Sequence, residues 1–192
     1  MVFRYLPVRI GAAEAARLFW RPRAGNLYGL WRARPVKSGP DGYPASMELI
    51  WMPAYAFRLG LSRGQVRTST WVSVDGSFGG FALFERRGLL KEGRPEEICL
   101  PAVVDQARAE HLARQGFLRY VMRRRGVKPN IEATEEVLPY HAPVWVYYYH
   151  RFGKKIDLAV LDGYAGNPMG GQVRAAIVNA FIQTRRVSSP HS

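Results

Sequence analysis

The sequence predicts an α+β fold in which helices pack on one face of antiparallel sheet units, and in which this unit occurs twice. A Pro-x-aromatic-x-aromatic segment begins at Pro53 and again at Pro143. Each segment leads through a polar turn and a second apolar strand to an Asp-Gly-x-x-Gly motif, at residues 75–79 and 162–166. A unit that recurs within one chain sets its architecture, so we predict an internal duplication.

The two repeats are predicted to meet at a charged linker, residues 86–97, which is rich in Arg, Glu and Gly. We therefore expect one αβ repeat in residues 1–94 and a second in residues 95–192, either as two domains or as one fused domain. A chain of 192 residues is long enough to bury a hydrophobic core in either arrangement.

The first half is predicted to contain a helix followed by a hairpin. Its predicted elements are a short edge strand (3–10), a helix (12–20), two hairpin strands (47–59 and 65–75) and a third strand (81–85). Pro7 disfavours a central position for the first strand because proline cannot donate to a sheet ladder. Val66, Val72 and Val74 alternate with polar residues, as expected for a strand with one buried face.

The second half repeats this order until its last element. Its predicted elements are a long helix (101–125), a polar loop (127–136), two hairpin strands (144–151 and 155–161) and a final helix (172–185). Pro101 suits the first helical position, and Gly126 suits the left-handed cap that ends the helix. We expect Gly116 to kink this helix. The final helix replaces the third strand of the first repeat.

The composition is that of a globular protein with few options for metal or disulfide chemistry. Apolar residues make up 47% of the chain. The single cysteine, Cys99, excludes an intrachain disulfide and a multi-cysteine metal site. The histidines lack metal-ligand spacing, so we expect no metal and no cofactor. With neither a secretory signal nor a membrane-spanning run in the sequence, we expect a cytoplasmic protein.

The net charge is unusual for a globular protein. The chain has 28 basic and 15 acidic residues, which gives a formal net charge of +13, and 23 of the basic residues are arginine. A GC-rich genome would explain the ratio of arginine to lysine, but it explains the net charge less well. The charge therefore predicts an anionic partner, which could be nucleic acid, a membrane surface or an acidic protein.

The order of elements resembles the PepSY family of small α+β domains. The resemblance rests on a helix, a hairpin and an Asp-x-x-x-Gly motif, at Asp75 to Gly79 and at Asp162 to Gly166. It covers most of the chain as two copies. The resemblance implies non-catalytic domains that bind or restrain other proteins, often outside the cytoplasm. This chain departs from that setting because it shows no signal and no membrane span.

The residues shared by the two motifs are interpreted as structural. They are Asp75, Gly76, Gly79, Asp162, Gly163 and Gly166. An Asp that precedes Gly at a strand end normally accepts hydrogen bonds from the turn's own backbone. The alternative is a pair of catalytic carboxylates that share a proton across an internal two-fold axis. We favour the structural interpretation and expect no enzyme, because no nucleophile, base and orienting group occur together.

Two basic segments predict a binding surface. The candidate contacts are Arg21, Arg23, Trp31, Arg32 and Arg34, with Arg123, Arg124 and Arg125 as a second patch. We expect an accessory or scaffold subunit that docks on a larger acidic protein partner through this basic, aromatic-rich surface. The alternative is nucleic-acid binding, with arginines on phosphates and bases stacked on the aromatic strands around Trp51 and Trp145. Peripheral membrane contact stays a further alternative.

Overall fold

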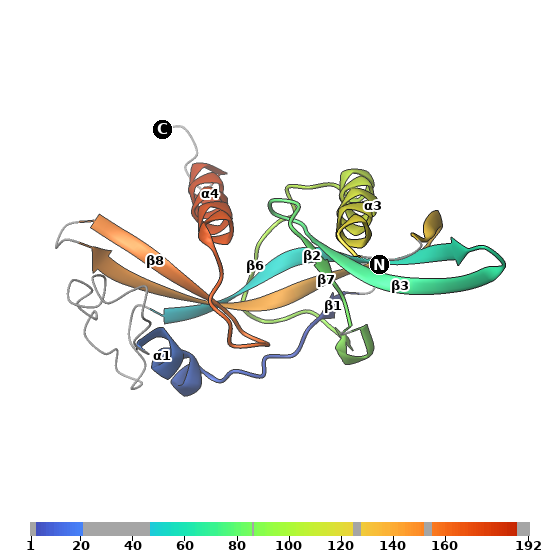
Figure 1. Ribbon diagram of the computed structural model, residues 1–192. Coiled ribbons are helices and arrows are strands. Elements are labelled where there is room, and N and C mark those ends of the chain that lie inside the picture. The colour runs from blue at the N-terminus through green and yellow to red at the C-terminus, as the bar shows by residue number, and fades with distance from the viewer. Residues whose placement is uncertain (1–2, 21–46, 86, 125–127, 152–154, 188–192) are drawn as a thin grey trace. The chain divides into compact units, whose positions relative to one another are not determined.

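The computed structural model describes residues 3–20, 47–85, 87–124, 128–151 and 155–187 (Figure 1). Within these ranges the fold is α+β, as predicted, with three α-helices and an eight-stranded sheet that is mostly antiparallel. The helices are α1 (Ala12–Trp20), α3 (Gln106–Met122) and α4 (Gly171–Val187). The strands are β1 (Arg4–Tyr5), β2 (Met47–Arg63), β3 (Val66–Asp75), β4 (Phe81–Leu83), β5 (Lys91–Glu92), β6 (Ile98–Cys99), β7 (Asn130–Arg151) and β8 (Lys155–Asp162).

The sheet follows the order β4-β3-β2-β7-β1-β5, with β6 paired to β2 and β8 paired to β7. β1 pairs with β7 in parallel, at Tyr5 and His141, and with β5 in the antiparallel sense. The edge strand predicted over residues 3–10 is therefore only two residues long and has a neighbour on each side. One of those neighbours, β5, comes from the predicted linker 86–97, which also contains the short 3-10 helix η2 (Arg87–Leu89).

The chain packs as two compact units that alternate along the sequence. Unit 1 comprises Met1–Leu6 and Met52–His141, and unit 2 comprises Pro7–Trp51 and Ala142–Ser192. β2 and β7 each contribute one part to each unit. Neither unit coincides with residues 1–94 or 95–192.

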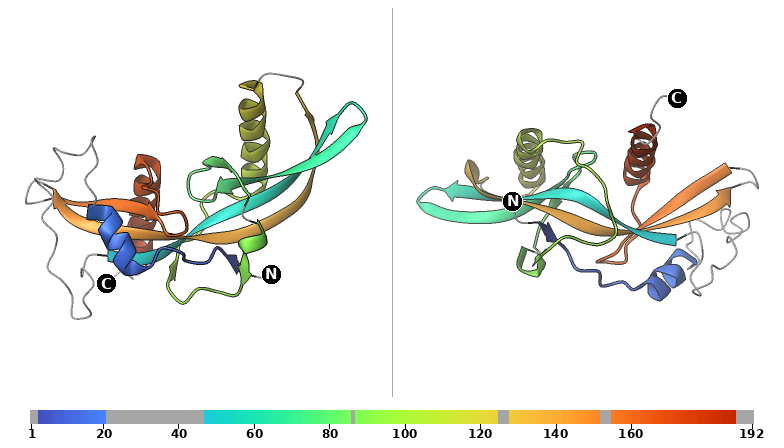
Figure 2. Two further views of the ribbon diagram at one scale, coloured as in Figure 1. Left: turned by 60° about the horizontal axis from the view of Figure 1, so that its bottom comes forward. Right: turned by 180° about the vertical axis from the view of Figure 1, so that it is seen from behind.

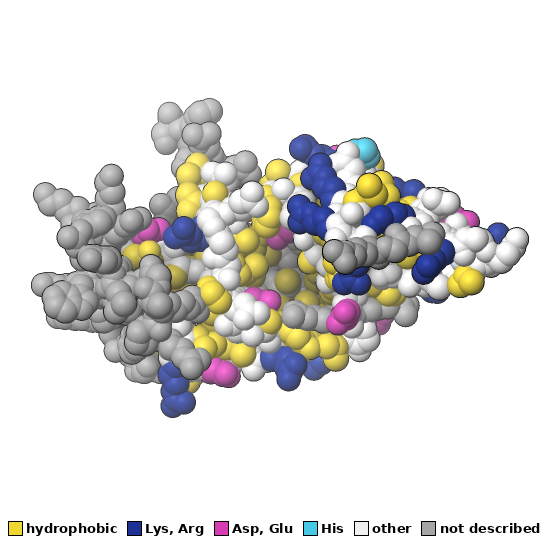
Figure 3. Space-filling view, viewed as in Figure 1, with side chains coloured by type: hydrophobic (Ala, Val, Ile, Leu, Met, Phe, Trp, Pro, Cys, Tyr) yellow, Lys and Arg dark blue, Asp and Glu magenta, His cyan; other side chains and the backbone are white. Residues whose placement is uncertain are grey.

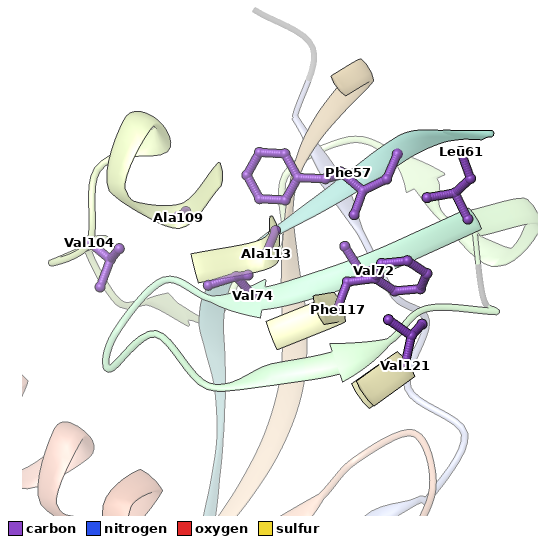
Figure 4. Packing of buried hydrophobic residues seen from close by; sticks show 10 residues of the cluster. Phe57, Leu61, Val72, Val74, Val104, Ala109, Ala113, Phe117 and Val121 are labelled. Carbon is purple, nitrogen blue, oxygen red and sulfur yellow. The ribbon is translucent and has the colours of Figure 1, made fainter. Parts of the chain in front are cut away.

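The core of unit 1 forms between the β2–β3 hairpin and α3. Phe57 pairs with Val72 across the hairpin, and both side chains are fully buried. Alternate residues of a strand point to the same face, so Leu59, Leu61 and Val74 join this apolar surface. Figure 4 shows these strand side chains together with those that α3 contributes.

α3 begins later than the sequence predicts. Pro101 is not its first residue, because Asp105 is the N-cap and accepts a hydrogen bond from the Arg108 N–H at 2.8 Å. The helix continues through Gly116 as one element. A side chain at Gly116 would place its Cβ 2.3 Å from Cγ of Phe81 in β4. Gly116 therefore permits close packing of helix on strand, and the predicted cap Gly126 lies outside the described residues.

The polar loop predicted over residues 127–136 is wrong, because β7 already begins at Asn130. Some of its polar side chains are paired within unit 1. Glu135 pairs with Arg58 (Nε to Oε2, 2.9 Å), and Thr134 donates to Glu110. Ile131 and Val137 pack against the apolar core. The polar sequence of this strand is therefore explained by its contacts: Glu135 pairs with Arg58 of β2, and Thr134 bonds to Glu110 of α3.

Unit 2 is organised around the hairpin of β8 and the second part of β7. Trp145 pairs with Leu161, and both side chains pack with Ala15 of α1. The opposite face of the hairpin is also apolar, with Val146 paired to Val160 and both buried. Figures 1 and 2 show α1 and α4 on opposite faces of this hairpin. The predicted placement of helices on one face is therefore wrong in unit 2, because both faces need a cover.

Candidate functional site

The candidate site is the outer surface of α3 in unit 1. α3 buries Ala109, Ala113, Phe117 and Val121, which recur at intervals of four residues. The opposite surface is exposed and consists of Arg108, His111, Leu118, Arg119, Met122 and the C-cap residue Arg123. We refer to these six residues as the α3 face. Figure 3 shows Lys and Arg side chains gathered over this helix.

Two residues of the α3 face are apolar and strongly exposed. Leu118 exposes 46% of its surface and Met122 exposes 67%. Single exposed apolar residues are common, but residues four apart on a helix are neighbours and form a continuous surface. Leu118 is followed in the sequence by Arg119, and Met122 by Arg123. Met and Arg are both enriched at the centres of protein–protein interfaces, so this combination favours binding of a protein.

The positive charge of the α3 face is not compensated locally. The one acidic residue within α3 is Glu110. Its carboxylate already pairs with Arg114 (Nε to Oε1, 3.5 Å) and accepts a hydrogen bond from Thr134 at 2.5 Å. Neither Arg119 nor Arg123 forms an ion pair with a described residue. Both guanidinium groups therefore remain available to an anionic partner.

Other cations at this end of α3 stabilise the helix itself. The Lys128 ammonium donates to the Val121 carbonyl oxygen at 2.9 Å, to that of Met122 at 3.4 Å and to that of Arg124. The guanidinium carbon of Arg124 lies 4.4 Å from the centroid of the Tyr120 ring. Cations that satisfy the last carbonyl groups of a helix also interact favourably with its dipole. Arg124 and Lys128 therefore already make contacts within the protein that stabilise the end of α3.

The structure describes part of the predicted binding surface. Arg123 is an exposed residue of the α3 face, and Arg124 lies beside it against Tyr120. The remaining predicted contacts lie outside the described residues; they are Arg21, Arg23, Trp31, Arg32, Arg34 and Arg125. Sequence reasoning missed Arg119, Leu118 and Met122. The signal was present, because helical spacing places Arg119 one turn before Arg123.

Three of the aromatic residues proposed for stacking are buried. Trp51 exposes 3% of its surface, Trp145 exposes 9% and Tyr147 exposes 6%. The Trp145 indole Nε1–H donates to the Ile10 carbonyl oxygen at 2.7 Å, and Tyr147 stacks on Phe19 with ring centroids 5.5 Å apart. These rings serve the core of unit 2, so they are not free to stack on bases.

The turn after β3 is held by its own aspartate. The Asp75 carboxylate oxygen Oδ1 accepts hydrogen bonds from the N–H groups of Ser77 at 2.7 Å and Phe78 at 3.1 Å. Gly79 closes the turn with a positive φ of 80° and donates to the Asp75 carbonyl oxygen at 2.9 Å. Burial raises the pKa of the Asp75 carboxyl above its usual value, although the two backbone hydrogen bonds act in the opposite direction.

The turn after β8 has the same hydrogen bonds in unit 2. Asp162 Oδ1 accepts from the N–H groups of Tyr164 at 2.8 Å and Ala165 at 3.1 Å. Gly166 has a φ of 71° and donates to the Asp162 carbonyl oxygen at 2.8 Å. In both turns the aspartate shapes the local backbone, which is the role that the sequence suggests for it.

The glycine after each aspartate connects the turn to a helix. Gly76 donates to the Pro53 carbonyl oxygen at 2.8 Å, and Gly163 donates to that of Pro143 at 2.9 Å. A Cβ at either glycine would lie 3.0 Å from the same proline oxygen. The Gly76 carbonyl accepts from residues 103 and 104 before α3, and the Gly163 carbonyl accepts from residues 9 and 10 before α1. These turns therefore position the helices.

The described residues include neither a cluster of metal-ligating side chains nor a membrane-spanning helix. Within those residues, no three His, Cys, Asp or Glu side chains lie close enough together to hold a metal ion. The described helices also include none with the length and apolar character needed to cross a membrane.

Comparison with known proteins finds no relative from which a function could be transferred. No family model, no curated protein and no solved structure matches the chain. The resemblance to PepSY domains stays a prediction from the sequence. The function must therefore be argued from the side chains themselves.

Proposed function

We propose that the protein is a non-enzymatic accessory subunit that docks, through the α3 face, on an acidic surface of a larger protein. The observation that carries this proposal is the exposure of Leu118 and Met122 beside the uncompensated charges of Arg119 and Arg123. Leu118 and Met122 supply apolar surface that is removed from water on binding. The arginines supply orientation and a faster association with an acidic partner.

Nucleic-acid binding accounts for less of this surface. Phosphate groups would satisfy Arg119 and Arg123, but a polyanion offers Leu118 and Met122 no apolar partner. Trp51, Trp145 and Tyr147, the aromatic residues that would provide most of the stacking, are buried. An acidic protein surface with an apolar centre complements both kinds of side chain, so we favour a protein partner.

A charge-reversal pair tests this proposal in the full chain. In Arg119→Glu/Arg123→Glu the formal net charge falls from +13 to +9. A matched control, Arg63→Glu/Arg67→Glu, makes the same change in charge on exposed residues at the tip of the β2–β3 hairpin. Tagged protein is isolated from its native host with and without nuclease. We expect the control to retain a stoichiometric protein partner and the α3 variant to lose it.

Three results would contradict docking through the α3 face. The partner could remain bound to the α3 variant, or both variants could lose it equally, which would indicate a non-specific charge effect. Nuclease could instead remove the bound material, which would favour nucleic acid.

A further variant, Met122→Ser, should weaken binding at high salt as well as low salt, because it removes apolar area and not charge.

We also infer that an αβ unit was duplicated and that its two copies exchange helices. α1 belongs to the first predicted repeat but lies in unit 2, whereas α3 belongs to the second and lies in unit 1. In each copy, the aromatic residue two positions after the shared proline bonds to the segment that precedes the helix. The Tyr55 hydroxyl donates to the Val104 carbonyl oxygen at 3.1 Å, and Trp145 donates to that of Ile10. This matched set of contacts supports the inference.

The third elements differ for a local reason. In the first repeat, Phe81 of β4 faces Val74 of β3, and in the second Pro168 forms an isolated bridge with Leu161. Met169 still donates to the Val160 carbonyl oxygen at 2.9 Å. The strand-like pairing then stops, and α4 begins at Gly171. Because the two copies exchange helices in this interpretation, a fragment that contains only one copy should fold only in the presence of the other.

A further inference from the structure

Unit 1 contains a cavity of about 330 Å³ that has no part in docking through α3. It lies among β1, the first residues that β2 contributes to unit 1, the last residues that β7 contributes, and the segment that precedes α3. A cavity of this size is at the small end of the range for small-molecule sites. Its lining combines apolar walls with two arginine side chains, Arg4 and Arg94.

Part of the wall is apolar and buried. Leu100 exposes 4% of its surface, Tyr140 exposes 6% and Ala54 exposes 8%. The hydroxyl groups of the two lining tyrosines are already bonded within the protein. The Tyr140 hydroxyl lies 2.8 Å from Ser73 Oγ, and the Tyr55 hydroxyl donates to Val104. The tyrosines therefore contribute mainly ring surface to the cavity.

Arg94 is held in place at one side of the cavity. The Gly93 N–H donates to the Phe3 carbonyl oxygen at 3.0 Å, which fixes the backbone next to Arg94. The Arg94 guanidinium carbon lies 5.5 Å from the centroid of the Phe3 ring. The Phe3 ring in turn stacks on His141, with centroids 5.1 Å apart and planes 10° apart. The arginine is therefore supported by a stacked pair of rings.

The charge of the cavity is positive and has no counter-ion in its lining. Arg4 and Arg94 line it, and the described lining residues include no carboxylate. Arg4 pairs with Glu92 at 3.7 Å, but Glu92 is outside the lining and its side chain is 71% exposed. A guanidinium group next to apolar walls and without a carboxylate partner is a common means of binding an anion.

The other ionisable residues of the lining do not neutralise this charge. Burial, with a smaller contribution from the charge of Glu97 outside the lining, raises the pKa of the Cys99 thiol, and the charge of Arg94 and its hydrogen bond oppose that shift, so the thiol stays protonated at neutral pH. Burial and then Arg94 lower the pKa of His141, so its imidazole is neutral there and can offer a hydrogen bond without adding charge. The arginines therefore remain the charged groups of the cavity.

We propose that this cavity binds a small organic carboxylate whose apolar body rests on Leu100, Ala54 and Tyr140 and whose carboxylate faces Arg94. The planar fork of the guanidinium group matches a carboxylate in a bidentate arrangement. The size of the cavity restricts the ligand to a single-ring or short-chain acid. This site is independent of the α3 face.

The test uses the full-length protein and phenylacetate as the probe. Phenylacetamide, which has nearly the same shape and no charge, is the matched control ligand. Binding is measured by calorimetry and by amide chemical shifts of Phe3 and Leu100. We expect phenylacetate to bind and phenylacetamide to bind about tenfold to a hundredfold more weakly, since hydrogen bonds to charged groups have roughly that effect.

Two variants locate the charged contact. Arg94→Gln should lower the affinity for phenylacetate by about tenfold or more and leave that for phenylacetamide unchanged. Arg94→Lys keeps the charge but not the planar fork, so its affinity for phenylacetate should lie between that of the wild type and that of Arg94→Gln. Arg67→Gln, on the exposed hairpin, should leave the affinity unchanged. Equal affinity for acid and amide, an unaltered affinity in Arg94→Gln, or no binding of phenylacetate, benzoate or hexanoate at millimolar concentration would overturn the proposal.

Discussion

At the scale of single residues, Asp75 shows how a side chain can shape a turn while its own charge is unfavourable. Its carboxylate accepts two backbone N–H groups, which favours the charged form, yet burial outweighs them and raises the pKa above its ordinary value of 3.8. A carboxyl with a raised pKa in the fold stabilises the protein below its unfolded pKa. That contribution is lost as the pH rises from 3.8 through the folded pKa.

Substitution of Asp75 separates hydrogen bonding from charge. Asp75→Asn keeps an oxygen that can accept from Ser77 and Phe78, so we expect it to be at least as stable as the wild type near neutral pH and to lose the decline in stability with rising pH. Asp75→Ala loses both bonds and should be destabilised by about 1–3 kcal/mol. Urea unfolding at several pH values measures both effects, and Asp162→Ala is the matched change in the second turn.

One outcome for the two Asp75 variants would contradict this prediction. If Asp75→Asn were as unstable as Asp75→Ala at neutral pH, the negative charge itself would be required for the turn. The pKa argument would then have the wrong sign. A wild-type protein whose stability rises between pH 3.8 and neutrality because of Asp75 would lead to the same conclusion.

At the scale of elements, the packing of α3 on β4 depends on Gly116. In an exposed helix, Ala in place of Gly usually stabilises by about 1 kcal/mol. Here a Cβ would lie 2.3 Å from Phe81, so we expect Gly116→Ala to destabilise by about 1–3 kcal/mol instead. In a Phe81→Ala background the same substitution should be neutral or stabilising. Denaturant unfolding of the double-mutant cycle measures this coupling, and a stabilising effect in the wild-type background would contradict it.

Local patterns predicted most elements but not their ends. The alternation around Val72 and the glycines between the strands predicted the β2–β3 hairpin. β7 was missed over residues 130–143, because the strand was expected only from residue 144. In its polar first part, Glu135 and Thr134 pair with Arg58 and α3, which only the folded chain brings near. The turn aspartates were identifiable, since an Asx turn is formed within a few residues. The α3 face required knowledge of which helix side is buried.

At the scale of the whole molecule, the grouping of elements into units could not be predicted from local patterns. Helix, hairpin and turn follow one another in each half of the sequence, so the simplest expectation is that each half packs on itself. The structure groups α1 with the β7–β8 hairpin and α3 with the β2–β3 hairpin. Pairing between elements far apart in sequence depends on complementary surfaces that no short segment records.

This exchange predicts how the chain behaves when it is divided. Residues 1–96 include α1 and the β2–β3 hairpin, which belong to different units. Residues 97–192 include α3 without the hairpin of its unit, and the β7–β8 hairpin with α4 but without α1, so each fragment lacks a helix that covers its hairpin. We expect each fragment alone to lack cooperative unfolding and the two together to form a one-to-one complex. Circular dichroism and size-exclusion chromatography measure both, and the full chain nicked after Glu96 is the control. A cooperatively folded, monomeric fragment 1–96 would contradict the exchange, because its α1 and its hairpin would then have to pack on each other.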